Sequence, residues 1–116
     1  MSPHSIVHVE LSAKDAKAAG KFYADIFGWK VESWQDSDYV TFETEPDRGG
    51  GFNTIDKDHI AGEIIPYVLV EDIDAMLAKI KSHGGKTVQE KTEISGVGHY
   101  ALFEDPSGNR LGLYGS

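Results

Sequence analysis

The stretch Tyr39-Val-Thr-Phe-Glu43 decides the fold, because its pattern Y-x-x-F-E returns as Tyr100-Ala-Leu-Phe-Glu104. An acidic residue followed by proline comes within three residues of each copy, and a helical pattern ending in glycine precedes each copy. Self-similarity of this kind indicates an internal duplication. We therefore expect two similar halves that fold in the same way.

The first half begins with a strand over Ile6 to Ser12, where Val7, Val9 and Leu11 alternate with His8, Glu10 and Ser12. Ser12-x-x-Asp15 has the form of a capping box, and apolar residues then recur at helical spacing from Ala16 up to Gly28. Further strands are expected at Trp29 to Trp34, Tyr39 to Thr44 and Phe52 to Asp56. The run Glu45 to Gly51 is interpreted as a break in the chain, with Gly49-Gly-Gly51 as a flexible turn. Residues Asn53 to Gly62 are interpreted as the linker between the halves.

The second half repeats this order. Pro66 to Val70 predicts a strand, and Asp72 caps a helix with apolar residues at Ile73, Met76, Leu77 and Ile80 that Gly84-Gly85 ends. Strands follow at Thr87 to Thr92, Tyr100 to Glu104 and Leu111 to Tyr114. Asp105-Pro-Ser-Gly108 has the residues that a type I turn favours. The fold class is therefore α+β.

Length and charge limit the function. A chain of 116 residues fits one domain, 1–116, with a first module at 5–56 and a second at 63–115. The net charge of −8 disfavours nucleic acid or an anionic membrane as partner. The chain has no cysteine, no apolar stretch long enough to span a bilayer and no signal-peptide pattern at Met1-Ser-Pro-His. We expect a soluble, cytoplasmic protein.

Several motifs together resemble the vicinal oxygen chelate superfamily, which includes glyoxalase I, bleomycin-resistance proteins and extradiol dioxygenases. The motifs are Phe22-Tyr23-x4-Gly28-Trp29, Val70-Glu-Asp-Ile-Asp74, Gly84-Gly85-Lys86 and Asp105-Pro-Ser-Gly-Asn-Arg110. The resemblance implies two βαβββ modules that form an open β cup, with the helices outside and the ligand site inside. It also implies a homodimer, since a second chain completes or supports the cup in many members of this length.

If the helices pack on the apolar strand faces, the opposite faces line a cleft that would bind a small organic molecule. Superposing the two helix starts matches Ile65, Tyr67 and Leu69 to His8, Glu10 and Ser12. The side chains expected in this ligand-binding cleft are His8, Glu10, Tyr39, Thr41, Tyr67, Leu69, Tyr100, Leu102 and Tyr114, with Ser12 and Glu43 as further candidates.

The resemblance also implies a divalent metal held by His and Glu ligands, and His8 matches the first ligand position. Three of the four positions depart from the pattern: Ile65 or Pro66, Gly112, and the strand Phe52 to Ile55, which has no carboxylate before Asp56. Glu43 lies one strand too early. We therefore expect no metal ligands and no cofactor, with an atypical divalent-metal site left open.

Three functions stay open at this point. The first is a metal-free protein that binds a small organic molecule. The second is an isomerase or oxygenase of the same superfamily, with an atypical metal site or with His8 and Glu10 as a metal-free base. The third is an interaction module with a vestigial cleft. Ordinary packing is the alternative role for His8, and His59, His83 and His99 are interpreted as surface or rim residues.

Overall fold

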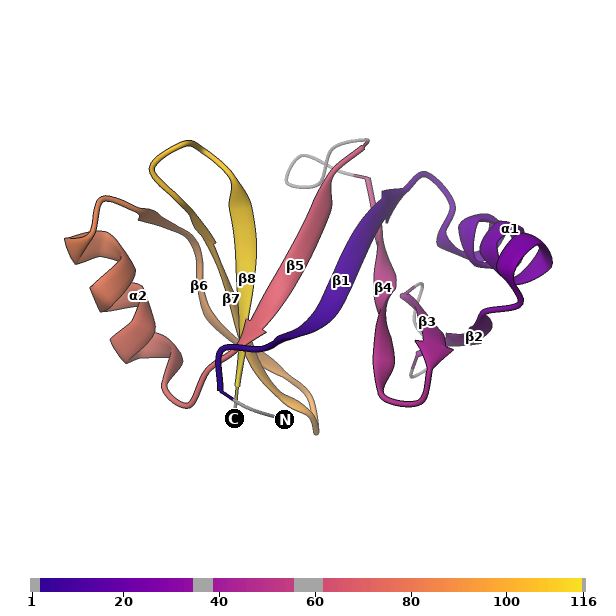
Figure 1. The fold of residues 1–116 in the computed structure, drawn as a ribbon, viewed down its shortest axis with the longest axis horizontal. Coiled ribbons are helices and arrows are strands. Elements are labelled where there is room, and N and C mark those ends of the chain that lie inside the picture. The colour runs from indigo at the N-terminus through magenta and orange to yellow at the C-terminus, as the bar shows by residue number, and fades with distance from the viewer. Residues whose placement is uncertain (1–2, 35–38, 56–61, 116) are drawn as a thin grey trace. The chain divides into compact units, whose positions relative to one another are not determined.

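The computed structural model describes residues 3–34, 39–55 and 62–115. Within these ranges the order strand, helix, strand, strand, strand occurs twice (Figure 1), which confirms the α+β class and the two βαβββ modules. The elements are β1 (Ile6–Ala13), α1 (Ala16–Phe27), β2 (Lys30–Ser33), β3 (Val40–Glu45), β4 (Arg48–Thr54), β5 (Ile64–Leu69), α2 (Ile73–Ser82), β6 (Lys86–Ile94), β7 (Gly98–Glu104) and β8 (Arg110–Gly115).

The chain divides into two compact units. The N-unit is His8–Ile64, and the C-unit combines Met1–Val7 with Ile65–Ser116. In the N-unit the strand order is β2-β3-β4-β1, and in the C-unit it is β6-β7-β8-β5. The first and last strands of each module pair in parallel, and the other neighbours are antiparallel. Parallel neighbours need a long crossover, which the helix and two strands between them supply.

Each helix begins at an aspartate. Asp15 is the N-cap of α1 and accepts a hydrogen bond of 3.1 Å from the Ala18 amide, while Asp72 accepts one of 3.0 Å from the Ala75 amide. The capping box expected from Ser12 is therefore wrong: Ser12 still belongs to β1, and Asp15 itself has the extended backbone of an N-cap residue. Gly28 ends α1 with φ +73°.

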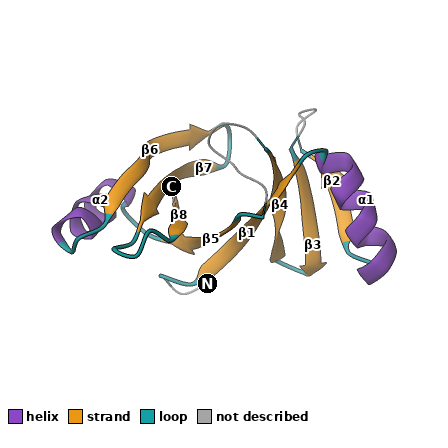
Figure 2. Ribbon diagram, turned by 90° about the horizontal axis from the view of Figure 1, so that it is seen from above, coloured by secondary structure: helices purple, strands orange, loops and turns teal. Residues whose placement is uncertain are grey.

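Each helix covers one face of its own sheet (Figure 2). In the N-unit, Ala13 and Ala16 pack with Val40, Phe42 and Phe52. The approach is close at Gly20, where a Cβ would lie 2.7 Å from Val31 Cγ1. The buried core of the C-unit has the same position between helix and sheet and consists of Val70, Ile73, Leu77, Ala101 and Leu113.

The glycine run of the first half is strand, and its interpretation as a flexible turn is wrong. Gly49 to Gly51 lie inside β4, while Pro46 and Asp47 form the turn before it. A Cβ on Gly50 would overlap the backbone carbonyl of Val9, and one on Gly49 would overlap that of Phe42. Glycine is needed here because neighbouring strands approach too closely for a side chain.

Two other expectations concern the ends of elements. Asn53 and Thr54 complete β4, so the predicted linker is wrong at its start, and positions 56–61, with His59 and Asp56, lie outside the described residues. The turn at Asp105 is confirmed, because the Gly108 amide donates to the Asp105 carbonyl at 2.9 Å.

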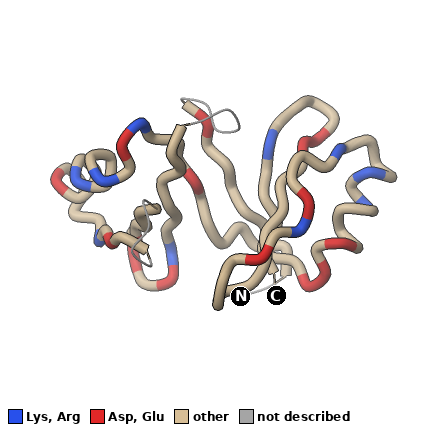
Figure 3. The backbone as a smooth tube through the Cα atoms, turned by 180° about the vertical axis from the view of Figure 1, so that it is seen from behind, with Lys and Arg blue, Asp and Glu red and all other residues tan. Residues whose placement is uncertain are grey.

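Neither α1 nor α2, the helices of the described ranges, is long and apolar enough to cross a membrane. Acidic and basic residues lie interspersed along both units (Figure 3).

Candidate functional site

The candidate site lies on the sheet face of the N-unit that is opposite to α1. Leu11 and Ala13 of β1 pack toward the helix, so the alternation of the strand directs His8 and Glu10 to the other face. In β4, Phe52 joins the helix-side core, which directs Gly51 and Asn53 to the same face as Glu10. The parallel register places Glu10 beside Gly51. The strands β1 and β4 thus bring polar groups to one surface.

Tyr39 joins these polar groups into a chain of hydrogen bonds. Its hydroxyl lies 2.9 Å from His8 Nε2 and donates to Glu10 Oε2 at 3.0 Å. The second carboxylate oxygen of Glu10, Oε1, accepts from Asn53 Nδ2 at 2.5 Å. His8 Nε2 also lies 3.8 Å from Glu10 Oε2. We call this hydrogen-bonded series of His8, Tyr39, Glu10 and Asn53 the polar chain.

The protonation of the polar chain follows from its geometry. Burial and then the adjacent Glu10 carboxylate raise the pKa of Tyr39 well above the ordinary tyrosine value, so its hydroxyl keeps its proton at neutral pH. Because this proton is donated to Glu10, the Tyr39 oxygen is the acceptor toward His8. His8 therefore carries a proton on Nε2. The side chain of His8 is 33% exposed and that of Glu10 is 12% exposed, so solvent reaches the histidine end.

Gly51 has no side chain and so leaves room for the Tyr39 ring. A Cβ on Gly51 would overlap the Tyr39 hydroxyl and the adjacent ring carbons. Tyr39 therefore occupies the space that a side chain of β4 would fill. The buried Gly51 thus has a role in the site, which its interpretation as part of a turn had not predicted.

Other predicted residues of the N-unit stand outside the polar chain. The Thr41 hydroxyl donates to the Glu32 carbonyl at 3.4 Å. Glu43 pairs in register with Gly49 and with Lys30, toward the far end of β3. Ser12 lies opposite Asn53. Sequence reasoning missed Asn53, and the available signal was the two-residue spacing of Gly49, Gly51 and Asn53 along one strand.

The corresponding face of the C-unit is apolar and aromatic. Tyr67 and Leu102 are 6% and 5% exposed and form one cluster with Ile65, and Tyr100 and Tyr114 pack against it. The cluster is separate from the helix-side core of Ile73 and Leu77. Four predicted cleft residues, Tyr67, Tyr100, Leu102 and Tyr114, are thus brought together. Leu69, a half-buried residue of β5, is not among the members of this cluster.

The register in the C-unit repeats that of the N-unit. Tyr67 pairs with Gly112 as Glu10 pairs with Gly51. A Cβ on Gly112 would overlap the Tyr67 ring. Both units therefore hold a tyrosine ring over the glycine of their last strand, although Tyr67 belongs to β5 and Tyr39 precedes β3.

Comparison with known proteins decides the family. The sequence model of the Glyoxalase/Bleomycin resistance protein/Dioxygenase superfamily matches residues 5–113. The chain belongs to this superfamily. The resemblance inferred from the sequence motifs is thereby confirmed.

Two curated proteins are distantly similar to this chain in sequence. A "Putative glyoxylase CFP32" of Mycobacterium tuberculosis is 27% identical over 91% of this chain and 43% of its own length. The "Anthracycline biosynthesis protein DnrV" of Streptomyces peucetius is 24% identical over 97% of this chain and 47% of its own length. The chain thus spans less than half the length of these curated relatives.

Among solved structures, methylmalonyl-CoA epimerase from Mycobacterium tuberculosis is similar, with a TM-score of 0.73 and 17% identity over 99% of this chain and 92% of that one. The Mn(II)-bound glyoxalase from Novosphingobium aromaticivorans has a TM-score of 0.68 and 19% identity over 99% of this chain and 40% of that one. At these identities the likeness concerns the fold.

Within residues 3–34, 39–55 and 62–115, the side chains do not fit the metal centre that the superfamily resemblance implies. The position matched to His8 in the second half is Ile65, a buried apolar residue, and Gly112 of β8 has no side chain. In the first half the last strand offers Gly51, covered by Tyr39, and Asn53, which donates to Glu10. No group of three or more metal-binding side chains occurs among the described residues. His8 and Glu10 instead share the Tyr39 hydroxyl.

Proposed function

We propose that this protein binds a small organic molecule on the polar-chain face of the N-unit, without the metal centre usual in its superfamily. The observation that carries the proposal is the polar chain itself, which fixes a partly exposed imidazole beside a proton-sharing tyrosine and carboxylate. Sites of this kind orient a ligand through a few placed polar groups on an otherwise apolar surface.

The chemistry of the face limits the ligand. A carbonyl, hydroxyl or carboxylate oxygen suits the imidazole end, because His8 donates from nitrogen when it is protonated and accepts when it is neutral. We therefore expect an oxygen-bearing compound. The name of the anthracycline-biosynthesis relative makes an anthracycline a reasonable probe.

Thermal shift with a compound panel tests the proposal. The panel contains an anthracycline, simpler hydroxylated aromatics and small carbonyl compounds, and a hit is confirmed by calorimetry. A ligand that binds only the folded state raises the Tm through linkage. His8→Ala is expected to keep its fold and lose the response, while His83→Ala, at the exposed end of α2, keeps the response.

Two results would contradict the proposal. One is a panel in which no compound raises the Tm, which favours an interaction module with a vestigial site. The other is an equal response in His8→Ala and the wild type. A large loss of stability in His8→Ala would show that this residue serves packing instead.

A second candidate function is metal-free acid–base catalysis, favoured by the 2.9 Å and 3.0 Å contacts that join His8 to Tyr39 and Tyr39 to Glu10. In this function, His8 takes a proton from the carbon next to a substrate carbonyl, and the tyrosine and carboxylate stabilise the imidazolium. Exchange of that proton for deuterium in D2O, followed by NMR over the carbonyl compounds, tests it. Exchange should survive a chelator and fall in His8→Ala.

A further inference from the structure

A groove within the C-unit lies between the residues before β1 and the start of α2. It has a volume of about 320 Å³, and its apolar wall consists of Pro3, Val70, Ala75 and Met76. Val70 is 4% exposed and belongs to the helix-side core, against which Met76 also packs. Packed interiors are rigid, and pockets of roughly 300–1,000 Å³ hold small molecules. We call this site the α2 groove, and its wall is preformed.

Charged side chains lie at the two ends of the α2 groove. Glu71 and Asp72 line it where the helix begins, and Lys79 lines it further along the helix. Asp72, Met76 and Lys79 follow one another at spacings of four and three residues, which places them on one face of α2. At roughly 1.5 Å per helical residue, Asp72 and Lys79 are about 10 Å apart along the axis. The groove thus has an acidic end and a basic end.

These charged groups are accessible to a ligand. Glu71, Asp72 and Lys79 are all exposed. In the part of the chain that the structure describes, neither the Glu71 carboxylate nor the Lys79 ammonium group takes part in an ion pair. Asp72 caps the helix through Oδ1, which accepts from the Ala75 amide at 3.0 Å, so Oδ2 remains for a further contact.

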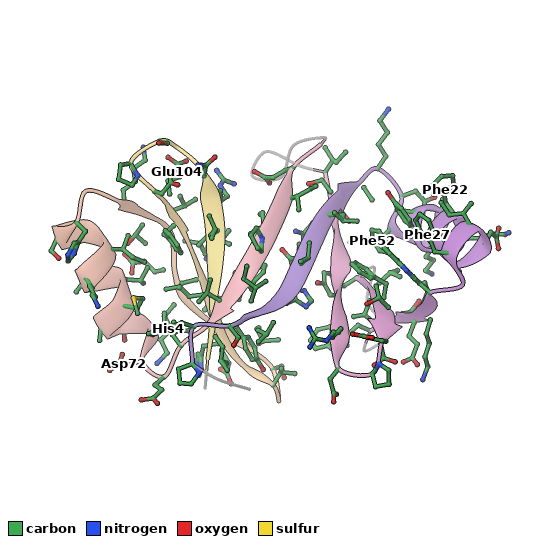
Figure 4. All side chains as sticks on the ribbon, viewed as in Figure 1. His4, Phe22, Phe27, Phe52, Asp72 and Glu104 are labelled. Atoms are coloured by element: carbon green, nitrogen blue, oxygen red, sulfur yellow. The ribbon has the colours of Figure 1, made fainter. Side chains whose placement is uncertain are left out.

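His4 adds a hydrogen-bonding group to the same groove. Figure 4 shows His4 near the start of α2, where Asp72 lies. The backbone of His4 has φ +70°, a left-handed conformation that glycine adopts with less strain. Its amide donates to the Leu69 carbonyl at 2.7 Å, which fixes this segment to the end of β5. An imidazole has at least one N–H in either protonation state, so His4 offers a donor at a fixed place.

A ligand complementary to these groups carries charges of both signs. An ammonium group suits the acidic end, a carboxylate suits the basic end, and apolar groups between them cover the wall. Three residues of extended peptide span about 10 Å, at roughly 3.3–3.6 Å each. This length matches the separation of the two ends along α2. A single amino acid carries both charged groups on one carbon atom and is too short to reach both ends.

We propose that the α2 groove binds a zwitterion with an apolar body, namely a peptide of about three residues with free ends. The ammonium group of the peptide pairs with Glu71 and Asp72, and its carboxylate pairs with Lys79. His4 donates to a peptide carbonyl, and an apolar side chain of the peptide covers Met76. The site is separate from the polar chain, which belongs to the N-unit.

NMR titration of the isotope-labelled full chain with the tripeptide Ala-Leu-Ala tests the proposal. The amide signals of Val70, Ala75 and Met76 should shift, while those of the polar chain stay in place. Acetylating the amino end of the peptide, or amidating its carboxyl end, should each weaken binding by about fivefold, as expected for loss of an exposed charge pair. Free leucine should bind more weakly than the tripeptide. Unmoved signals at the groove, or equal affinities for free and blocked peptides, overturn the proposal.

Two charge-removing variants assign the ends of the peptide. Lys79→Gln should abolish the preference for a free carboxylate over the amide and keep the preference for a free ammonium group. Glu71→Gln should reduce the second preference and keep the first. Lys81→Gln and Glu90→Gln are the matched controls, since both residues are exposed, belong to the C-unit and do not line the groove. A Lys79→Gln variant with the full preference for the carboxylate overturns the proposed orientation.

Replacing His4 separates its contact with the ligand from its place in the fold. His4→Gly removes the imidazole and still accepts the left-handed backbone, so the Tm should stay close to that of the wild type. The affinity for the tripeptide should fall several-fold, because one hydrogen bond is lost. An affinity equal to that of the wild type overturns the role assigned to His4.

Discussion

The helix-distant faces of the two units share a backbone plan and differ in chemistry. In both, the first and last strands pair in parallel with a glycine opposite a central residue of the first strand, and in both a tyrosine ring covers that glycine. In the N-unit the central residue is Glu10, which joins His8, Tyr39 and Asn53. In the C-unit it is Tyr67, which packs with Ile65 and Leu102. The two units thus share a tyrosine ring above the glycine, and they differ in the position that supplies this tyrosine and in the side chains around it.

Substituting these glycines is expected to give the largest change in the free energy of unfolding. Gly112→Ala is expected to cost about 2–3 kcal/mol, because the new methyl meets a buried ring held by its neighbours. Gly51→Ala should cost less, about 1–2 kcal/mol, because its methyl meets the hydroxyl end of Tyr39, which can move away at the cost of its hydrogen bonds. Urea unfolding of both variants measures the difference. An equal or larger loss for Gly51→Ala would mean that Tyr39 is held as rigidly as Tyr67.

Removing one tyrosine hydroxyl from each unit compares the polar face of the N-unit with the aromatic face of the C-unit. Tyr39→Phe leaves the largely buried Glu10 carboxylate with one donor fewer, which should cost about 1–2 kcal/mol. Tyr114→Phe is the matched control. Its hydroxyl makes an exposed bond of 3.2 Å to the Val97 carbonyl, whose loss should cost about 0.5 kcal/mol. Equal losses in denaturant unfolding would show that the polar chain contributes no more than a surface bond.

A further effect is absent near neutral pH and appears only in alkaline solution. Burial, and then Glu10, raise the folded pKa of Tyr39 above the ordinary value of 10.0. The folded state therefore holds the proton after the unfolded chain has lost it, so stability falls as pH rises above about 10, by up to about 1.4 kcal/mol per pH unit. Near neutral pH no change is expected. Unfolding of the wild type and Tyr39→Phe across this range measures the difference, and identical alkaline slopes would contradict the assignment.

Local patterns in the sequence were sufficient for much of the fold. The two helices, the repeated order of strands and the turn at Asp105 follow from periodicity, aspartate caps and glycine stops, which act within a few residues. The register of Tyr67 against Gly112 agrees with the superposition made from the helix starts. Alternation also brought together four residues of the aromatic cluster.

The polar chain could be predicted only in part. His8, Glu10 and Tyr39 were candidates because of alternation, but the hydrogen bonds joining them depend on a ring that crosses from before β3 to the surface of β4. That crossing needs Gly51 as an empty position, and a run of three glycines looks locally like a turn. Asn53 was missed for the same reason, since the predicted break extended to Gly51, whereas β4 already begins at Arg48.

The grouping of the first residues with the C-unit has a consequence for synthesis. The amides of His4 and Leu69 donate to the carbonyls of Leu69 and Ser5, at 2.7 and 2.8 Å. During synthesis, His4 and Ser5 therefore cannot form these hydrogen bonds until Leu69, about sixty positions later, has been added. The helix of the N-unit, by contrast, forms from near neighbours. His4 and Ser5 should thus acquire these native contacts later than the helix of the N-unit acquires its own.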